Sequence, residues 1–218
     1  MTAVLPEAAS PPRLRITVEG AEAVGFAASP TLRFLLRIDG DGDVRSVLLT
    51  TRIRIAAPRR THTAEEKERL AELFGPPAEW GRTLHALEWA QTVTQVPPFT
   101  GSTVTAVDVP CTYDFDVAAT KYLHCLADGE VPLEFLFTGT VFYEADGRLL
   151  AARIPHGTGA EHRMPVRVWR DVMDRYFPSS AWLRLSREVF DRLYAYRVRH
   201  TLLSWDETVD ALLRAGGE

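Results

Sequence analysis

VPPFTGSTVTAVDVPCTYDFDVAATKYLHCLADGEVPLEFLFTGTVFY, residues 96–143, is the stretch that decides the predicted fold. β-Branched and aromatic residues are frequent in three runs within it, at Ser102–Val109, Thr112–Leu126 and Val131–Tyr143, and such residues favour extended strands. The Pro-Pro-Phe-Thr-Gly sequence before the first run is typical of a break between strands. The stretch therefore predicts consecutive strands of a β scaffold, and it contains no catalytic signature.

Further strand-like runs lie on both sides of this stretch. They are Leu14–Glu19, Thr31–Ile38, Val44–Ala56, Trp89–Val96 and Arg148–Ile154. Asp and Gly tolerate left-handed backbone conformations, so the Asp-Gly-Asp-Gly-Asp sequence at 39–43 predicts a hairpin turn, and Ala-Asp-Gly at 145–147 predicts another. Several short strands separated by turns predict a mainly β fold with α, specifically an antiparallel β-sandwich of immunoglobulin-like type.

Helices are predicted in two places. A capping-box pattern at 63–66 begins an inserted helix over residues 63–75. The second place is a C-terminal helical layer over 165–215, in which apolar residues recur at helical spacing over Ser186–Arg199 and a further capping box begins at Ser204. The fold is thus predicted as a β-sandwich with one helical insert and a C-terminal helical layer.

Length and composition predict one principal domain. The 218 residues are 46% hydrophobic, which is enough for a single sizeable core. Residues 1–12 are rich in Ala and Pro without periodicity and predict a disordered lead-in. Residues 13–218 then form a single domain that carries the helical insert and the C-terminal helices.

Charge and segment composition exclude several classes of protein. A net charge of −4 argues against binding to nucleic acid, which requires many cationic contacts to phosphate. No run reaches the roughly 18 apolar residues needed to span a membrane, and the first residues lack a secretory signal. Two cysteines are too few for a disulfide framework. We therefore expect a cytoplasmic protein with reduced thiols.

Cys111, His124 and Cys125 are weak candidates for a metal site, with Asp114 and Asp116 nearby in the sequence. Thiolates and imidazole suit zinc or nickel, but the paired Cys-x-x-Cys spacing of structural zinc sites is missing. If His124 and Cys125 lie on a strand, their side chains point to opposite faces. No resident metal and no cofactor are therefore predicted.

Two further motifs contain residue types suited to proton transfer or calcium binding. His156 and His162 flank a Gly-Thr-Gly loop and can serve proton transfer, although no partnered nucleophile accompanies them. The acids at 39, 41 and 43 resemble a calcium loop, but position 50 is Thr50 where such a loop needs Glu. The glycine patterns of nucleotide-binding loops are absent from the sequence.

Aromatic residues among arginines make a candidate protein interface. Arginine and aromatic side chains are enriched at interface anchors, and both are frequent in the C-terminal helical part. The alternative is that the aromatic residues pack inward while the arginines are solvated. The candidate interface residues are Phe99, Trp169, Trp182, Tyr194 and Arg197.

Three blocks of the sequence resemble an uncharacterised actinobacterial family of domains of unknown function. They are residues 96–143, MPVRVWRDVMDRYFP at 164–178 and WLRLSREVFDRLYAYR at 182–197. Genes of that family tend to neighbour those of nickel–iron hydrogenases and their maturation factors. The resemblance implies an accessory role beside such an enzyme, by gene neighbourhood rather than through any residue.

The sequence therefore predicts a non-catalytic interaction or assembly factor, with hydrogenase subunits or maturation factors as possible partners. One alternative is a carrier of a small ligand or metal around Cys111 and His124. A second alternative is an enzyme that uses His156 or His162 in acid–base catalysis. Chains built for hydrogenase catalysis or electron transfer carry cysteine sets for metals and clusters, and this sequence has none.

Overall fold

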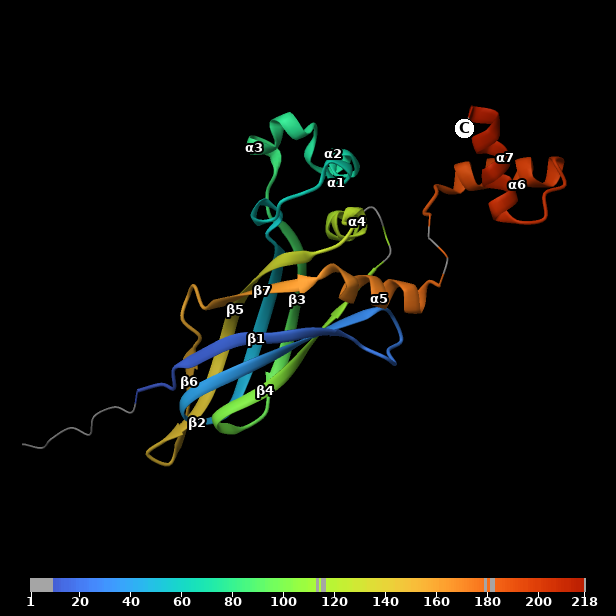
Figure 1. Ribbon diagram of the computed structural model, residues 1–218. Coiled ribbons are helices and arrows are strands. Elements are labelled where there is room, and N and C mark those ends of the chain that lie inside the picture. Colours follow the sequence, from blue (N-terminus) through green and yellow to red (C-terminus); the bar gives the residue numbers. More distant parts are fainter. Residues whose placement is uncertain (1–9, 113, 115–116, 179, 181–182, 218) are drawn as a thin grey trace, which may run out of the picture. The chain divides into compact units, whose positions relative to one another are not determined.

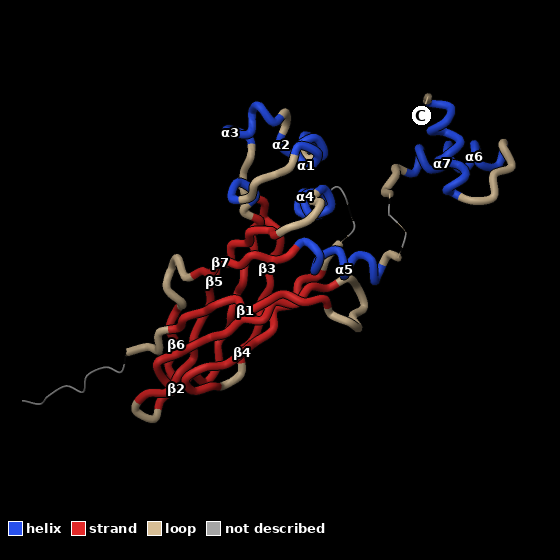
Figure 2. Tube along the Cα trace, viewed as in Figure 1, coloured by secondary structure: helices blue, strands red, loops and turns tan. Residues whose placement is uncertain are grey.

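The structure is a computed structural model that describes residues 10–112, 114, 117–178, 180 and 183–217. Most of the lead-in predicted for residues 1–12 lies outside this range. The chain groups into two compact units, where the sequence pattern predicts one domain: a sheet unit, Met1–Ala181, and a helical unit, Trp182–Glu218. Figures 1 and 2 show strands as the main elements of the sheet unit.

One antiparallel sheet of seven strands forms the sheet unit. β3 and β4 follow one edge of the long strand β2, while β1 and β5 follow the other, and β5 also pairs with β6 and β7. The strands are β1 Leu14–Ala23, β2 Thr31–Ile55, β3 Leu87–Val96, β4 Phe99–Pro110, β5 Glu130–Ala145, β6 Arg148–Arg153 and β7 Gly159–Pro165. The predicted mainly β, antiparallel class is confirmed. The immunoglobulin-like sandwich is not confirmed, because the described strands form one open sheet.

The predicted hairpin at residues 39–43 is wrong, because these residues lie inside β2. The run before them pairs with β1 and β4, and the run after them pairs with β3 and β5. These distant strands occupy both edges of each half, so the halves do not pair with each other. Asp39 pairs with Ser102 and Asp43 pairs with Thr100, so β2 advances by four residues where β4 advances by two. The surplus residues of β2 form an irregularity in the pairing.

A second irregularity in β2 keeps both halves facing the same core. Val44 pairs with Tyr143 and Ser46 with Phe142, so Arg45 is an extra residue in the register with β5. Side chains alternate along a strand, and one extra residue reverses which positions face inward. The buried positions change accordingly from even to odd: Leu32, Phe34, Leu36 and Ile38, then Val47, Leu49, Thr51, Ile53 and Ile55.

The opposite face of the sheet carries ion pairs between neighbouring strands. Their side chains are largely exposed, as expected for an antiparallel sheet with one solvated face. The pairs include Arg33–Asp108 (2.7 Å), Arg37–Glu19 (3.5 Å), Arg45–Glu144 and Arg52–Glu88 (2.9 Å). A charged, solvated face of this kind does not favour packing of a second sheet on it.

The inserted helix is present, divided into short pieces between β2 and β3. They are the 3-10 turn Ala57–Arg59, α1 Ala64–Arg69, α2 Ala71–Phe74, the 3-10 turn Pro77–Glu79 and α3 Trp80–Thr83. Thr63 and Glu66 form the predicted capping box at the start of α1. Gly75 follows α2 with a φ of 74°, a conformation that favours glycine. Figure 1 shows these helices beside α4, Ala118–Cys125, at one end of the sheet unit.

Two predicted elements of the sheet unit are corrected. The sequence pattern predicts a strand over Thr112–Leu126, but this run contains the helix α4, whose Ala119, Tyr122 and Leu123 are buried at helical spacing. The segment around His162 was expected as a loop, but it is the strand β7. The Ala-Asp-Gly turn is confirmed: Asp146 and Gly147 both have positive φ between β5 and β6.

Predicted C-terminal helices are confirmed in both units. α5, Val166–Tyr176, belongs to the sheet unit and buries Trp169, Val172 and Met173 in its core. α6, Arg187–Arg199, and α7, Trp205–Gly216, form the helical unit. Ser186 and Ser204 accept hydrogen bonds from the backbone at their first turns, as N-cap residues do. None of the described helices is long and apolar enough to span a bilayer.

Candidate functional site

The three metal-site candidates lie at the edge of the core. Cys111 is buried after β4, with its Sγ 3.5 Å from the Val109 carbonyl oxygen. His124 and Cys125 are adjacent on α4 rather than on a strand, with Cys125 buried and its Sγ 3.6 Å from the Arg69 carbonyl oxygen. Asp116 lies outside the described residues. Within the described part of the chain, no three His, Cys, Asp or Glu side chains lie close enough to bind a metal ion together.

Burial makes both thiols poor nucleophiles and poor metal ligands. It raises the pKa of Cys111 to about 12, and it also raises the pKa of Cys125. The thiolate is the form that attacks electrophiles and binds metals, and both thiols stay protonated near neutral pH. Their environment is that of structural core cysteines.

The two candidate acid–base histidines have different environments. His156 is exposed in the loop after β6, where Thr138, Gly139 and Arg153 join it around a shallow depression of about 460 Å³. His162 lies on β7, half-buried, with its ring edge-to-face on Phe34. Burial lowers the pKa of His162, which keeps its imidazole neutral at physiological pH.

The interface candidates fall into three groups. Trp169 is buried in the sheet-unit core, so it offers no surface. The ring of Phe99 lies over Gly40, against the core, and is only partly exposed. Tyr194 and Arg197 are on α6 in the helical unit, and Trp182 lies outside the described residues. Only the α6 residues therefore remain as described surface candidates.

Aromatic and arginine side chains close the turn between α6 and α7. The Arg197 guanidinium lies 4.8 Å from the centre of the Trp205 ring and donates to the carbonyls of Leu202 and Leu203. Tyr194 also packs on Trp205, with the ring centroids 6.3 Å apart. Arg197 is thus a structural residue that fixes this turn rather than a free surface charge.

Apolar side chains of the helical unit remain exposed despite these contacts. Thr208 is the one buried residue among those described on α6 and α7. Tyr194 is 52% exposed and Val198 is 62% exposed. The full exposed set is Leu183, Val189, Phe190, Tyr194, Val198, Leu203, Trp205, Val209, Leu212 and Leu213. Such density of exposed apolar groups is typical of a surface that binds another protein.

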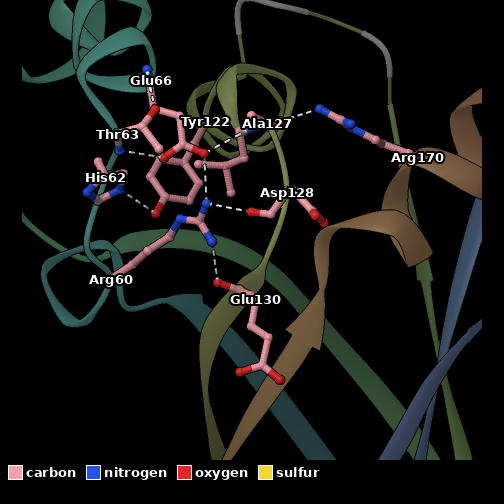
Figure 3. A network of polar contacts seen from close by, with 10 residues as sticks. Arg60, His62, Thr63, Glu66, Tyr122, Ala127, Asp128, Glu130 and Arg170 are labelled. Atoms are coloured by element: carbon pink, nitrogen blue, oxygen red, sulfur yellow. Dashed lines mark hydrogen bonds and ion pairs between the residues drawn. The ribbon is translucent and has the colours of Figure 1, made fainter.

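A buried polar network in the sheet unit was not predicted from the sequence (Figure 3). The Arg60 guanidinium donates to Glu66 Oε1 at 2.7 Å and to the carbonyls of Asp128 (2.7 Å) and Glu130 (2.6 Å). Glu66 is 1% exposed and also accepts from the backbone N–H of Ala127 at 2.9 Å. The network thereby joins the helical insert to the segment between α4 and β5.

Arg60 and Glu66 form an ion pair within this network. Burial opposes ionisation of Glu66, but hydrogen bonds from Ala127 and Thr63 and the Arg60 guanidinium together lower its pKa. Beside this pair, His62 Nε2 lies 2.9 Å from the Tyr122 hydroxyl. Burial and the charge of Arg60 lower the pKa of His62. The arrangement therefore ties the helical insert to the segment before β5, while the Arg60 Nε is buried without a hydrogen-bond partner among the described residues.

Fold and surface together define a class: a mainly antiparallel β protein with a short C-terminal helical unit rich in exposed apolar side chains. The chain belongs to a family of unknown function, DUF6084, whose profile matches residues 11–218. Comparison with curated proteins gives no match.

One solved structure that shares limited similarity is the crystal structure of β-glucosidase from Kluyveromyces marxianus in complex with glucose. The sequences are 7% identical, the TM-score is 0.24, and the match covers 70% of this chain and 15% of that chain. At that TM-score the similarity carries no argument about fold or activity.

Proposed function

We propose that this protein is a non-catalytic protein-interaction or assembly factor that binds through its helical unit. The observation that carries this proposal is the exposed apolar surface of α6 and α7, which includes Phe190 (44%) and Leu213 (47%). Apolar groups in water cost free energy that a protein partner recovers by covering them. Aromatic and arginine residues in the same unit fit the composition of interface anchors.

Chemistry in the sheet unit supports the two alternatives less well. A metal or small-ligand carrier around Cys111 and His124 needs an accessible thiolate, whereas burial raises the pKa of Cys111. An acid–base enzyme needs a histidine beside a reacting position, and His162 has its ring against the core. Both alternatives remain proposals of lower rank.

For the partner, we propose subunits or maturation factors of a nickel–iron hydrogenase, on the sequence resemblance described above, and we place the encounter in the cytoplasm. A protein partner is favoured over nucleic acid, because the chain carries a net charge of −4.

Affinity purification from native cells at low salt tests this proposal, with the bound proteins identified by mass spectrometry. The full-length tagged protein should retain a partner in fixed ratio. The double variant Phe190→Ser/Leu213→Ser should lose it. The matched control Leu149→Ser/Leu150→Ser removes exposed apolar groups from β6 and should retain it. Recovery of the protein without any partner would contradict an assembly role.

A further inference from the structure

One face of α6 forms a groove bordered by arginines. The groove has a volume of about 420 Å³ and is lined by Val189, Leu193, Tyr196 and, from α7, Leu212. Arg192 and Arg199 stand among these apolar residues, at helical spacing from Val189. Both arginines are exposed, and neither has an acidic partner in the part of the chain that the structure describes.

The exposed face of α7 carries the opposite charge. Asp206, Asp210 and Leu213 follow one another at spacings of four and three residues and so share a helix face, with Val209 beside them. All four are exposed. Asp210 pairs with Arg214 within the helix, and Asp206 has no basic partner among the described residues. α7 is therefore an acidic amphipathic helix that complements the groove on α6.

The helical unit is small, and Thr208 is the one buried residue among those described on its two helices. It spans 37 residues, and chains below about 40 residues usually need disulfides, metals or oligomerisation. Both cysteines of the chain lie outside it, at positions 111 and 125. Within its described residues, no cluster of side chains can bind a metal ion. Oligomerisation is the stabilising device that remains among these three.

We propose that the occupant of the α6 groove is α7 of a second copy of this chain. Two such contacts related by a two-fold axis bury the apolar faces of the α6–α7 pairs of both copies in a four-helix arrangement. This inference rests on the proposed interaction role of the helical unit and names its first partner.

Charge and helix direction agree with an antiparallel contact between α6 and the second α7. Arg199 is the last residue of α6, and Asp206 is in the first turn of α7. Antiparallel packing places the C-terminal end of one helix beside the N-terminal end of the other. It brings Arg199 to the partner's Asp206 and brings opposite ends of the helix dipoles together. Each copy contributes both a basic and an acidic helix, so the contact is self-complementary.

The test measures the mass of the purified full-length protein by light scattering and sedimentation, over concentrations from about 1 to 200 µM. The wild type should be a dimer at the upper end of this range. Arg192→Glu/Arg199→Glu makes both helices acidic, and Asp206→Lys/Asp210→Lys makes both basic. Each variant alone should dimerise at least about 10-fold more weakly, because like charges then face each other. Far-UV circular dichroism verifies that both variants keep their helices.

Mixing the two variants provides the decisive measurement. In the mixed dimer, the acidic α6 of the Arg192→Glu/Arg199→Glu variant contacts the basic α7 of the Asp206→Lys/Asp210→Lys variant. The second contact joins the unchanged α7 of the first variant to the unchanged α6 of the second. A heterodimer of nearly wild-type affinity should form. Arg148→Glu/Arg153→Glu on β6 is the matched control and should leave the dimer unchanged.

The inference is overturned by a monomer at every concentration, or by a mixture of the two variants that does not associate. A dimer that is insensitive to both charge reversals would also place the contact elsewhere. The outcome is distinguishable from failure of the proposed function. A monomer that still retains partners in a Phe190- and Leu213-dependent manner leaves the assembly role standing, and a dimer that retains no other protein leaves only self-association.

Discussion

The sheet unit and the helical unit use similar residues in different ways. In the sheet unit, large apolar side chains such as Phe34, Phe135 and Phe137 are fully buried, and arginines pair with acids across neighbouring strands. In the helical unit, apolar side chains remain exposed, and Arg192 and Arg199 have no acidic partner among the described residues. The difference is that one unit buries its large apolar side chains and pairs its arginines, while the other leaves both kinds of side chain exposed.

The largest expected effect comes from the buried ion pair. Glu66→Gln leaves the Arg60 charge buried without its counter-ion and should lower the free energy of unfolding by about 3–5 kcal/mol, measured with urea. Glu65→Gln is the control, because the Glu65–Arg69 pair is exposed on the same helix. It should cost less than about 0.5 kcal/mol. Equal effects would mean that the network is not buried.

A matched pair of leucines contrasts the two units directly. Leu36 is fully buried in β2, so Leu36→Ala should lower the free energy of unfolding by about 2–5 kcal/mol through the lost contacts and the cavity. Leu213 is 47% exposed on α7, so Leu213→Ala should change the unfolding of the sheet unit by less than about 0.5 kcal/mol. A large effect of Leu213→Ala on that unit would remove the contrast.

Acid should weaken the sheet unit through His62. Burial and Arg60 lower its pKa below 6.5, so the unfolded chain binds the proton at a higher pH than the folded chain does. The free energy of unfolding should therefore fall as the pH drops below about 6.5, by at most about 1.4 kcal/mol per pH unit for one histidine. Urea titrations at pH 7.5 and 5.5 measure this fall.

His62→Gln should reduce the pH dependence while also lowering stability at both pH values, since the bond to Tyr122 is lost. His162 shifts in the same direction and should supply part of the remaining dependence. An unchanged pH dependence in His62→Gln would show that His62 is not the titrating group.

The smallest effect is expected on the charged face of the sheet. Arg52→Gln removes the exposed ion pair with Glu88 and should cost no more than about 1 kcal/mol, less still in 1 M salt. Urea unfolding at two salt concentrations measures it. A cost of several kcal/mol would indicate that another layer covers this face.

Local signals in the sequence predicted local structure well. The capping-box patterns at Thr63 and Ser204 predicted two helix starts correctly, because a cap is satisfied within a few residues. The full box forms at Thr63, whereas at Ser204 the Glu207 carboxylate accepts from the Leu203 N–H instead. The Asp-Gly cluster at 39–43 predicted a hairpin turn that does not form, because these residues lie within β2 and this strand pairs with β1 and β4 instead. β7 was missed although Ala160, His162 and Met164 alternate with more exposed residues, a weak period-two signal.

The candidate site was predicted less completely than the fold. Tyr194 was identified on a described surface, but Trp169 proved to be buried, because spacing alone does not tell which face of a helix meets the core. The Arg60–Glu66 pair was missed because Glu66 already fitted a capping role. Its second role depends on the hydrogen bond from the Ala127 N–H, 61 residues away, and on Arg60, which in turn donates to the Asp128 carbonyl.

The extra residue at Arg45 has a consequence for how this family can vary in length. Because Arg45 is the extra residue, its removal would restore regular alternation between Val44 and Val47 and leave Val47, Leu49 and Ile53 facing the core. Removing one residue between Val47 and Ile53 would instead turn the inward positions beyond it outward. Natural changes of one residue in the length of this strand should therefore occur at Arg45, and other single-residue gaps should fall in the connections between strands.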